Sequence, residues 1–274
     1  YKRQVYTFTL RKDAKWSDGQ AVTAKDFEYS WVRALTKETA AEYNYQLFYI
    51  KNGEKFYNGE ATRDELGIEV VDDHTLKVTL EAPTAYFPEL TAFTTYMPLR
   101  EDIVSADPDG WATEPETYVS NGPFKLVQWD MKDQLVFEKN KEYWNAKEIK
   151  LPGVVYKLVT DTNTAYSSLK SGDFDMVDTV PPAEIAGGQE EGLVTIYPNL
   201  ATYMLVINVG KQSTLPEDVK KALSNEKVRK ALAMSIDRKA ITENVTKSGQ
   251  VPAYSFVPKG ISVSYTHLTL PTNS

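Results

Sequence analysis

The chain has 274 residues, of which 42% are hydrophobic and 25% charged, a balance typical of a folded globular protein rather than a disordered one. Its 31 Lys and Arg residues against 38 Asp and Glu residues give a net charge of -7, which argues against a partner that is nucleic acid. The absence of cysteine excludes disulfides, thiolate nucleophiles and cysteine-based zinc sites, and no apolar run approaches the roughly 20 residues that cross a bilayer.

The first hundred residues alternate between strand patterns and helix patterns. Residues 5–10 alternate apolar and polar side chains as a strand does, and Asp-Gly at 18–19 indicates a turn. Thr23 and Asp26 are spaced as a capping box, and apolar side chains then recur every three or four positions, which predicts a helix. A shorter helix and the two strands of a hairpin are predicted to follow, at 43–50, 67–71 and 76–80.

The rest of the chain is predicted to mix strands and helices. Further strands are predicted at 124–129, 135–138, 154–159, 174–177, 193–197 and 202–209. Helices are predicted at 162–170, after Leu215, up to Ile236, and from an Asp237 cap to Gly249. Gly172 closes the first of these helices, and the order strand, helix, strand over 154–177 predicts a crossover unit. The predicted fold class is therefore α/β.

Few residues in this sequence suit catalysis. Residues 264–274 resemble the ending that appears when a sequencing adaptor is translated in frame, so they and His267 are left out of the functional interpretation. The other histidine, His74, lies in the predicted hairpin tip, where a solvated turn residue is the simplest interpretation. It has no serine partner and no second histidine, and the sequence has no glycine-rich phosphate loop. We expect no catalytic residue, metal or cofactor, although a pair of carboxylates as in a glycosidase stays open.

Aromatic residues are abundant, with 17 Tyr, 10 Phe and 5 Trp. Tyrosine combines a large ring with a hydroxyl, so it suits the walls of clefts that bind polar ligands. Tyr43, Tyr45 and Tyr49 lie close together in the sequence. From the residues alone, core packing is favoured over ligand contact for these three, because amphipathic rings are commonly part-buried.

Several stretches, taken in order, resemble the extracellular solute-binding proteins of family 5, the oligopeptide-binding subunits of ABC importers. They are YTFTLRKDAKWSDGQAVTAKDFEYSW at 6–31, DDHTLKVTLEAPTAYF at 72–87, SNGPFKLVQW at 120–129, FEKNKEYWN at 137–145, LKSGDFDMV at 169–177, VRKALAMSIDRKAI at 228–241 and VPAYSFVP at 251–258. No single stretch is decisive, but this many in the same order form a specific signature.

The resemblance implies a bilobal, periplasmic-binding-protein-like fold of type II, present incompletely. The implied parts are an extra small α/β domain of the first lobe at 1–100, part of the first ligand-binding domain at 101–200, the start of the second lobe at 201–263 and a non-native tail at 264–274. We expect a longer protein, with any export signal or lipid anchor outside this sequence.

The resemblance also implies a function outside the cytoplasm, in the periplasm or as a cell-surface lipoprotein. The complete protein would be a monomer that binds oligopeptides between its lobes and delivers them to ABC permease subunits. The ligand contacts carried over from the family are Tyr43, Thr179, Asn199, Tyr203 and Met204. Asn199 and Met204 replace tyrosines of well-studied members, and residues 198–203 are where a hinge crossing would lie.

Three alternatives stay open at this point. The same fold binds nickel chelates, oligosaccharides or opines in other members of the family. A sensor or adhesin with this fold would present its ligand to a surface partner instead of a permease. A carboxylate-dependent hydrolase would need two carboxylates about 5 to 10 Å apart in one cleft, a distance that a sequence does not contain.

Overall fold

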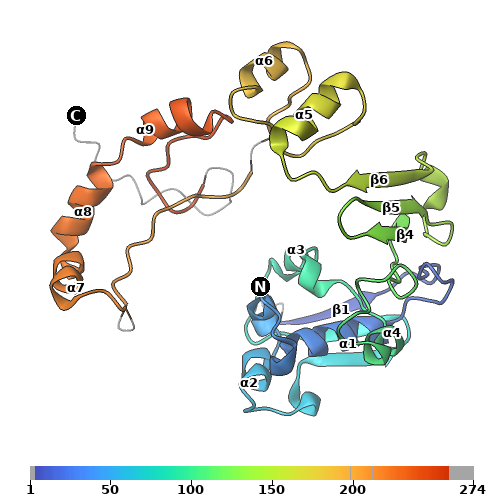
Figure 1. The fold of residues 1–274 in the computed structure, drawn as a ribbon. Helices are drawn as coiled ribbons and strands as arrows, with labels where there is room; N and C mark the ends of the chain where they lie inside the picture. Colours follow the sequence, from blue (N-terminus) through green and yellow to red (C-terminus); the bar gives the residue numbers. More distant parts are fainter. Residues whose placement is uncertain (1–3, 198, 211–212, 259–274) are drawn as a thin grey trace. The chain divides into compact units, whose positions relative to one another are not determined.

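The computed structural model describes residues 4–197, 199–210 and 213–258, which form two compact units that divide between Leu158 and Val159 (Figure 1). Unit 1 is the part of the chain before this boundary, and unit 2 is the part after it. The predicted tail at 264–274 lies outside the described residues.

The first sheet of unit 1 has three antiparallel strands in the order β1-β3-β2. These are β1 (Val5–Thr9), β2 (Ile68–Asp72) and β3 (Thr75–Thr79). Strands β2 and β3 confirm the predicted hairpin, and in its turn the Asp72 carboxylate accepts the main-chain N–H of His74 at 2.8 Å. Val78 stands opposite both Tyr6 and Ile68, so the inward side chains of the three strands share one face.

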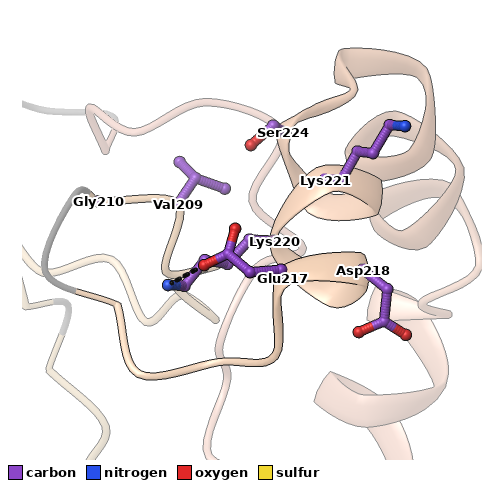
Figure 2. A pocket seen from close by; sticks show the side chains of 7 residues that line it. All are labelled: Val209, Gly210, Glu217, Asp218, Lys220, Lys221 and Ser224. Atoms are coloured by element: carbon purple, nitrogen blue, oxygen red, sulfur yellow. Dashed lines mark hydrogen bonds and ion pairs between the residues drawn. The ribbon is translucent and has the colours of Figure 1, made fainter.

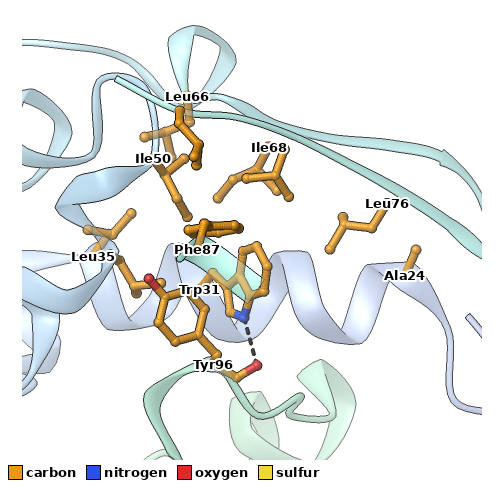
Figure 3. Close-up of a cluster of buried hydrophobic side chains, with 12 residues drawn as sticks. Ala24, Trp31, Leu35, Ile50, Leu66, Ile68, Leu76, Phe87 and Tyr96 are labelled. Carbon is orange, nitrogen blue, oxygen red and sulfur yellow. Dashed lines mark hydrogen bonds between the residues drawn. The ribbon is translucent and has the colours of Figure 1, made fainter. Parts of the chain in front are cut away.

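Helix α1 (Ala24–Leu35) contributes its buried face to the main core of unit 1. The predicted capping box is present, and within it the Asp26 carboxylate accepts the Thr23 N–H at 2.7 Å. The Trp31 indole N–H donates to the Tyr96 carbonyl at 2.8 Å inside this core (Figure 3). The core cluster comprises Ala24, Trp31, Leu35, Leu47, Ile50, Leu66, Ile68, Leu76, Val78, Leu80, Phe87 and Tyr96.

Short helical segments surround this core. They are η1 (Lys37–Thr39), η2 (Asn44–Tyr49), α2 (Gly53–Tyr57), η3 (Arg63–Glu65), α3 (Phe87–Leu90), η4 (Thr94–Tyr96) and α4 (Glu101–Ala106). The helix predicted at 43–50 is η2, which is wound as a 3-10 helix. Three residues per turn bring Leu47 and Ile50 to the same side, and both are buried in the core.

The second sheet of unit 1 is also antiparallel, in the order β4-β5-β6. Its strands are β4 (Phe124–Asp130), β5 (Gln134–Lys139) and β6 (Gly153–Lys157), and η5 (Ala146–Glu148) lies between the last two. Strands β4 and β5 confirm the hairpin predicted from 124 to 138. The strand predicted at 154–159 is β6, but it runs antiparallel to β5.

The regular elements in the described part of unit 2 are all helices. They are α5 (Thr162–Ser171), α6 (Ile185–Glu190), α7 (Glu217–Ser224), α8 (Glu226–Met234), α9 (Arg238–Ala240) and a π-helical turn, η6 (Ile241–Thr246). Both predicted ends of α5 are confirmed, because Asp161 accepts the Thr164 N–H at 2.7 Å and Gly172 takes a φ of 84°. Asp237 caps α9 as predicted, by accepting the Ala240 N–H at 2.9 Å.

The strands predicted at 174–177, 193–197 and 202–209 are wrong, since none of the described residues after Val159 lies in a strand. Alternation decides which side chains share a face, but a strand also needs a neighbour for its main-chain hydrogen bonds. In unit 1 a local turn supplies that neighbour to β2 and to β4. The crossover predicted over 154–177 is wrong for the same reason, and the last helical stretch ends at Thr246 rather than Gly249.

Candidate ligand-binding site

Tyr43 is the N-cap residue of η2, and 47% of its surface is exposed. Its ring packs edge-on against Phe93, with centroids 5.1 Å apart, and lies 6.1 Å from the ring of Tyr45. Tyr45 is also about half exposed, so the core packing that the residues alone favoured is wrong for both tyrosines. We call Tyr43, Tyr45 and Phe93 the ring shelf.

The ring shelf is supported from the main core. Tyr96 is buried in this core, edge-on to Trp31, with the two ring centroids 5.3 Å apart. The Tyr96 hydroxyl donates to the main-chain carbonyl of Gln46, which lies in η2 next to Tyr45. Burial raises the pKa of Tyr96, so the hydroxyl keeps its proton and remains a donor at physiological pH. The 3-10 helix that carries the shelf is therefore fixed to the core.

Tyr49 and Tyr86 form a second ring pair in unit 1, with centroids 5.8 Å apart and planes at 85°. Their hydroxyls lie 3.4 Å apart, and this hydrogen bond raises the pKa of Tyr49. Tyr86 is about half exposed. The pair presents an apolar edge and two hydroxyl groups, which is the surface chemistry that suits a ligand with both main-chain amides and side chains.

Tyr43 belongs to unit 1, and the other four predicted ligand residues belong to unit 2. They are Thr179, Asn199, Tyr203 and Met204. Thr179 is exposed in the loop between α5 and α6, and the other three lie in an irregular segment, 199–209. Tyr203 is 94% exposed. Residue 198, the first of the predicted hinge crossing, lies outside the described residues.

His74 differs from the solvated turn residue that the sequence predicted. It is half-buried, and its main-chain carbonyl accepts the Leu10 N–H at 2.7 Å, which ties the hairpin tip to the end of β1. Its Nδ1 is buried and has no hydrogen-bond partner in the described part of the chain. Within the same residues, no group of three or more histidine, aspartate and glutamate side chains is placed to hold a metal ion.

An open cleft of about 770 Å³ lies beside α7 in unit 2 (Figure 2). Its lining residues are Val209, Gly210, Glu217, Asp218, Lys220, Lys221 and Ser224. Lys220 Nζ pairs with Glu217 Oε1 at 2.9 Å along the helix, so part of the lining charge is neutralised within the cleft. No predicted ligand residue lines this cleft, and none of its polar side chains is buried.

Phe93 of the ring shelf and Tyr86 of the second ring pair were not singled out from the sequence. Tyr86 is the next-to-last residue of the stretch at 72–87 that resembles family 5, which was a usable signal. Phe93 lies outside every such stretch and meets Tyr43 only through the fold. No helix in the described part of the chain has the length and apolar character of a membrane span.

Comparison with known proteins identifies relatives along nearly the whole chain. The family profile of the bacterial extracellular solute-binding proteins, family 5 (middle region), matches residues 2–271. Oligopeptide-binding protein OppA of Bacillus subtilis is 37% identical over 259 residues, which cover 93% of this chain and 46% of OppA. The chain therefore spans about half the length of the curated relatives it matches.

Solved structures agree with this result. Listeria monocytogenes OppA bound to peptide matches with a TM-score of 0.81 and 35% identity, over 94% of this chain and 50% of that one. Haemophilus influenzae OppA in complex with RPPGFSPFR matches with a TM-score of 0.80 and 35% identity, over 93% and 49% of the two chains. These matches confirm the predicted fold class, an incomplete bilobal fold of type II.

Proposed function

The chain belongs to the bacterial extracellular solute-binding proteins, family 5, and from this premise we propose that the complete protein binds oligopeptides for an ABC importer. The observation that carries the proposal is an exposed ring shelf on a chain that matches OppA bound to peptide over 94% of its length. The family and the relatives are solute-binding proteins rather than enzymes, so the peptide would leave the protein chemically unchanged.

The peptide would be held in an extended form, chiefly through its main chain. Residues 199–209 support this, because in the described part of unit 2 their main chain is not engaged in a sheet. Main-chain hydrogen bonds give affinity whatever the peptide side chains are, and water completes the hydrogen bonding in roomy side-chain pockets. Binding of this kind tolerates many peptide sequences.

The five residues predicted to contact the ligand keep that role in the proposal. Tyr43 would offer its ring from unit 1, and Thr179, Asn199, Tyr203 and Met204 would offer their side chains from unit 2. The division into domains at 1–100, 101–200 and 201–263 belongs to the same proposal. The lobes would close about residues 198–203, driven only by contacts that improve in the closed form.

The remaining parts of the proposal concern location and partners. The relatives are extracellular or periplasmic proteins, which supports a site of action outside the cytoplasm. Delivery to permease subunits, a lipid anchor and a monomeric state follow the family pattern. A nickel chelate or an oligosaccharide as the ligand would contradict the peptide part of the proposal while leaving the binding role intact.

Isothermal titration calorimetry of the complete protein tests the function directly. We expect micromolar or tighter binding of RPPGFSPFR, the peptide in the Haemophilus influenzae complex, and recovery of that peptide intact by mass spectrometry. Tyr43→Ala should weaken binding about tenfold, which corresponds to about 1.4 kcal/mol, because it removes one aromatic wall.

Tyr156→Thr is the matched control for Tyr43→Ala. Tyr156 is exposed in the same unit, in edge strand β6, and its ring packs on Phe137 rather than on the ring shelf. Threonine suits a strand, so this variant should keep the affinity of the original protein. Failure to bind this peptide and a mixed peptide pool would overturn the peptide assignment, and cleavage of the peptide would overturn the assignment as a binding protein.

A further inference from the structure

The stretch KDAKWSDG at 12–19, part of the longest match to family 5, forms a turn next to the start of α1. Trp16 is buried in this turn, and its indole N–H donates to the Asp26 carboxylate at the start of α1 over 3.3 Å. The main chain closes on itself, since the Trp16 N–H donates to the Gln20 carbonyl at 2.8 Å. Gly19 takes a φ of 89°, a conformation that favours glycine. We call residues 13–19 the bridging turn.

The other side of the bridging turn contacts the segments that flank the second sheet. The Ser17 N–H donates to the Ser120 carbonyl at 2.7 Å, and the Ser120 N–H donates back to the Ser17 hydroxyl at 3.2 Å. Lys15 Nζ pairs with Glu142 at 2.9 Å. The turn therefore joins the core of the first sheet to the start of β4 and to the segment after β5.

Arg100 holds the tip of this turn. Only 7% of its side chain is exposed, and it is the only charged residue that is buried in the described part of the chain. Its Nη1 donates to Asp18 at 2.9 Å, and its Nε donates to Asp102 at 2.7 Å. A buried charge is costly unless it is paired in this way, so the guanidinium stabilises the one turn geometry that keeps Asp18 in reach.

A short segment connects Arg100 with the ring shelf. It starts at Phe93, which packs against Tyr43, and is fixed to α1 at two points before it reaches Arg100. The Ser30 hydroxyl donates to the Met97 carbonyl at 2.6 Å, and the Leu99 N–H donates to the Asp26 carbonyl at 3.2 Å. The segment therefore links Arg100 to Phe93, the ring that packs against Tyr43.

We propose that Arg100 is a positioning residue for ligand binding: through the bridging turn it makes the ring shelf and the β4-β5-β6 sheet move as one body. The part of this inference that concerns ligand binding rests on the proposed function. Arginine is required because its planar fork reaches Asp18 and Asp102 at once, whereas a lysine ammonium is a single point charge on a flexible stem.

Residue-resolved hydrogen exchange in the complete protein tests the inference. In Arg100→Met, the Ser17 and Ser120 amides should exchange at least about tenfold faster, while the Trp31 amide in the middle of α1 keeps its rate. Arg100→Lys should behave like Arg100→Met, because it restores the charge without the fork. Glu101→Gln is the matched control, since Glu101 is an exposed carboxylate next to Arg100 in the first turn of α4 and is not one of the two carboxylates that Arg100 bonds.

Affinity for RPPGFSPFR is the second readout, and it should fall about threefold to tenfold in Arg100→Met and remain unchanged in Glu101→Gln. Unchanged exchange at Ser17 and Ser120 would overturn the inference, and so would faster exchange with unchanged affinity. If Arg100→Met fails to fold, Asp18→Asn, a change at a partly exposed carboxylate, provides the same two measurements. An original protein that binds no peptide contradicts the proposed function alone, because the exchange result still decides whether Arg100 fixes the turn.

Discussion

The two units bury their apolar side chains to very different degrees. In unit 1 the main core joins one helix, a three-stranded sheet and several short helical segments around Trp31 and Phe87. In the described part of unit 2, Tyr166 and Ile185 are the only buried hydrophobic residues, while many others are open to solvent. The exposed set includes Tyr203, Leu205, Val206, Met234, Val251, Tyr254 and Phe256.

The difference shows what a hydrophobic pattern needs before it becomes a core. Both units contain amphipathic segments, but an apolar face is buried only when a second layer covers it. In unit 1 the β2–β3 hairpin and α1 cover each other and share one core. Residues 199–209 are equally apolar, but the described part of unit 2 supplies no strand to pair with them.

The largest expected effect tests the core of unit 1. Trp31→Ala should lower the free energy of unfolding by about 4 kcal/mol, because it leaves a cavity and removes the hydrogen bond to the Tyr96 carbonyl. Met234→Ala on α8 in unit 2 should change it by less than about 0.5 kcal/mol, since that side chain is largely exposed. Denaturant unfolding followed by far-UV circular dichroism measures both, and similar losses for the two variants would contradict the comparison.

A medium effect tests a tightly packed contact in the described part of unit 2. A Cβ at Gly188 in α6 would lie 2.5 Å from the Tyr166 hydroxyl and 2.5 Å from a Val194 methyl. Gly188→Ala should therefore cost about 2 kcal/mol by overpacking, measured by the same unfolding method.

Gly187→Ala is the matched control on the same helix, because a Cβ there meets open space and alanine favours a helix. The Tyr166 hydroxyl is buried without a hydrogen-bond partner in the described residues, so Tyr166→Phe should cost nothing and should relieve part of the clash in the double variant. Equal losses for Gly187→Ala and Gly188→Ala would show that α6 does not pack as described.

The smallest expected effect is on the pH dependence of stability, which has opposite signs for two carboxylates that cap helices, Asp26 and Asp161. Burial raises the pKa of Asp26 in unit 1 above its ordinary 3.8, although Thr23 and Trp16 donate to it. Its contribution to stability is therefore present below pH 3.8 and is lost as the pH rises through the raised value. In unit 2 the Thr164 hydroxyl and N–H lower the pKa of Asp161, so its contribution is present above pH 3.8 and is lost as the pH falls.

NMR titration of the side-chain carboxyl carbons measures these two midpoints directly. We expect Asp26 to titrate above 3.8 and Asp161 below it. Asp26→Asn and Asp161→Asn should each remove the corresponding slope from the plot of stability against pH. Midpoints in the opposite order would mean that the Asp26 carboxylate is solvated like that of Asp161.

Local signals in the sequence predicted much of the fold. The Thr23 and Asp26 spacing marked the start of α1, and Gly172 marked the end of α5, because capping depends on neighbours only a few residues apart. The hairpins were predictable for the same reason. Alternation failed at 202–209, because strand formation depends on a partner that the pattern itself does not specify.

The site was harder to predict than the fold. Tyr43 entered through resemblance to a family, and its exposure contradicts the packing that its own sequence context favoured. The contact of Phe93 with Tyr43 and the bond from Arg100 to Asp18 join distant segments, the latter across 82 positions. No periodicity relates such residues, so only the folded chain shows them together.

The placement of the indole side chains has a practical consequence for spectroscopy. All 5 tryptophans, among them buried Trp16 and Trp31 and the half-exposed Trp144 beneath the Arg11 guanidinium, precede residue 159. Intrinsic fluorescence excited at the indole band therefore reports on unit 1 alone, and unit 2 contributes only tyrosine emission. On heating, an indole signal that is lost later than the helical signal would show, without a label, that the two units melt separately.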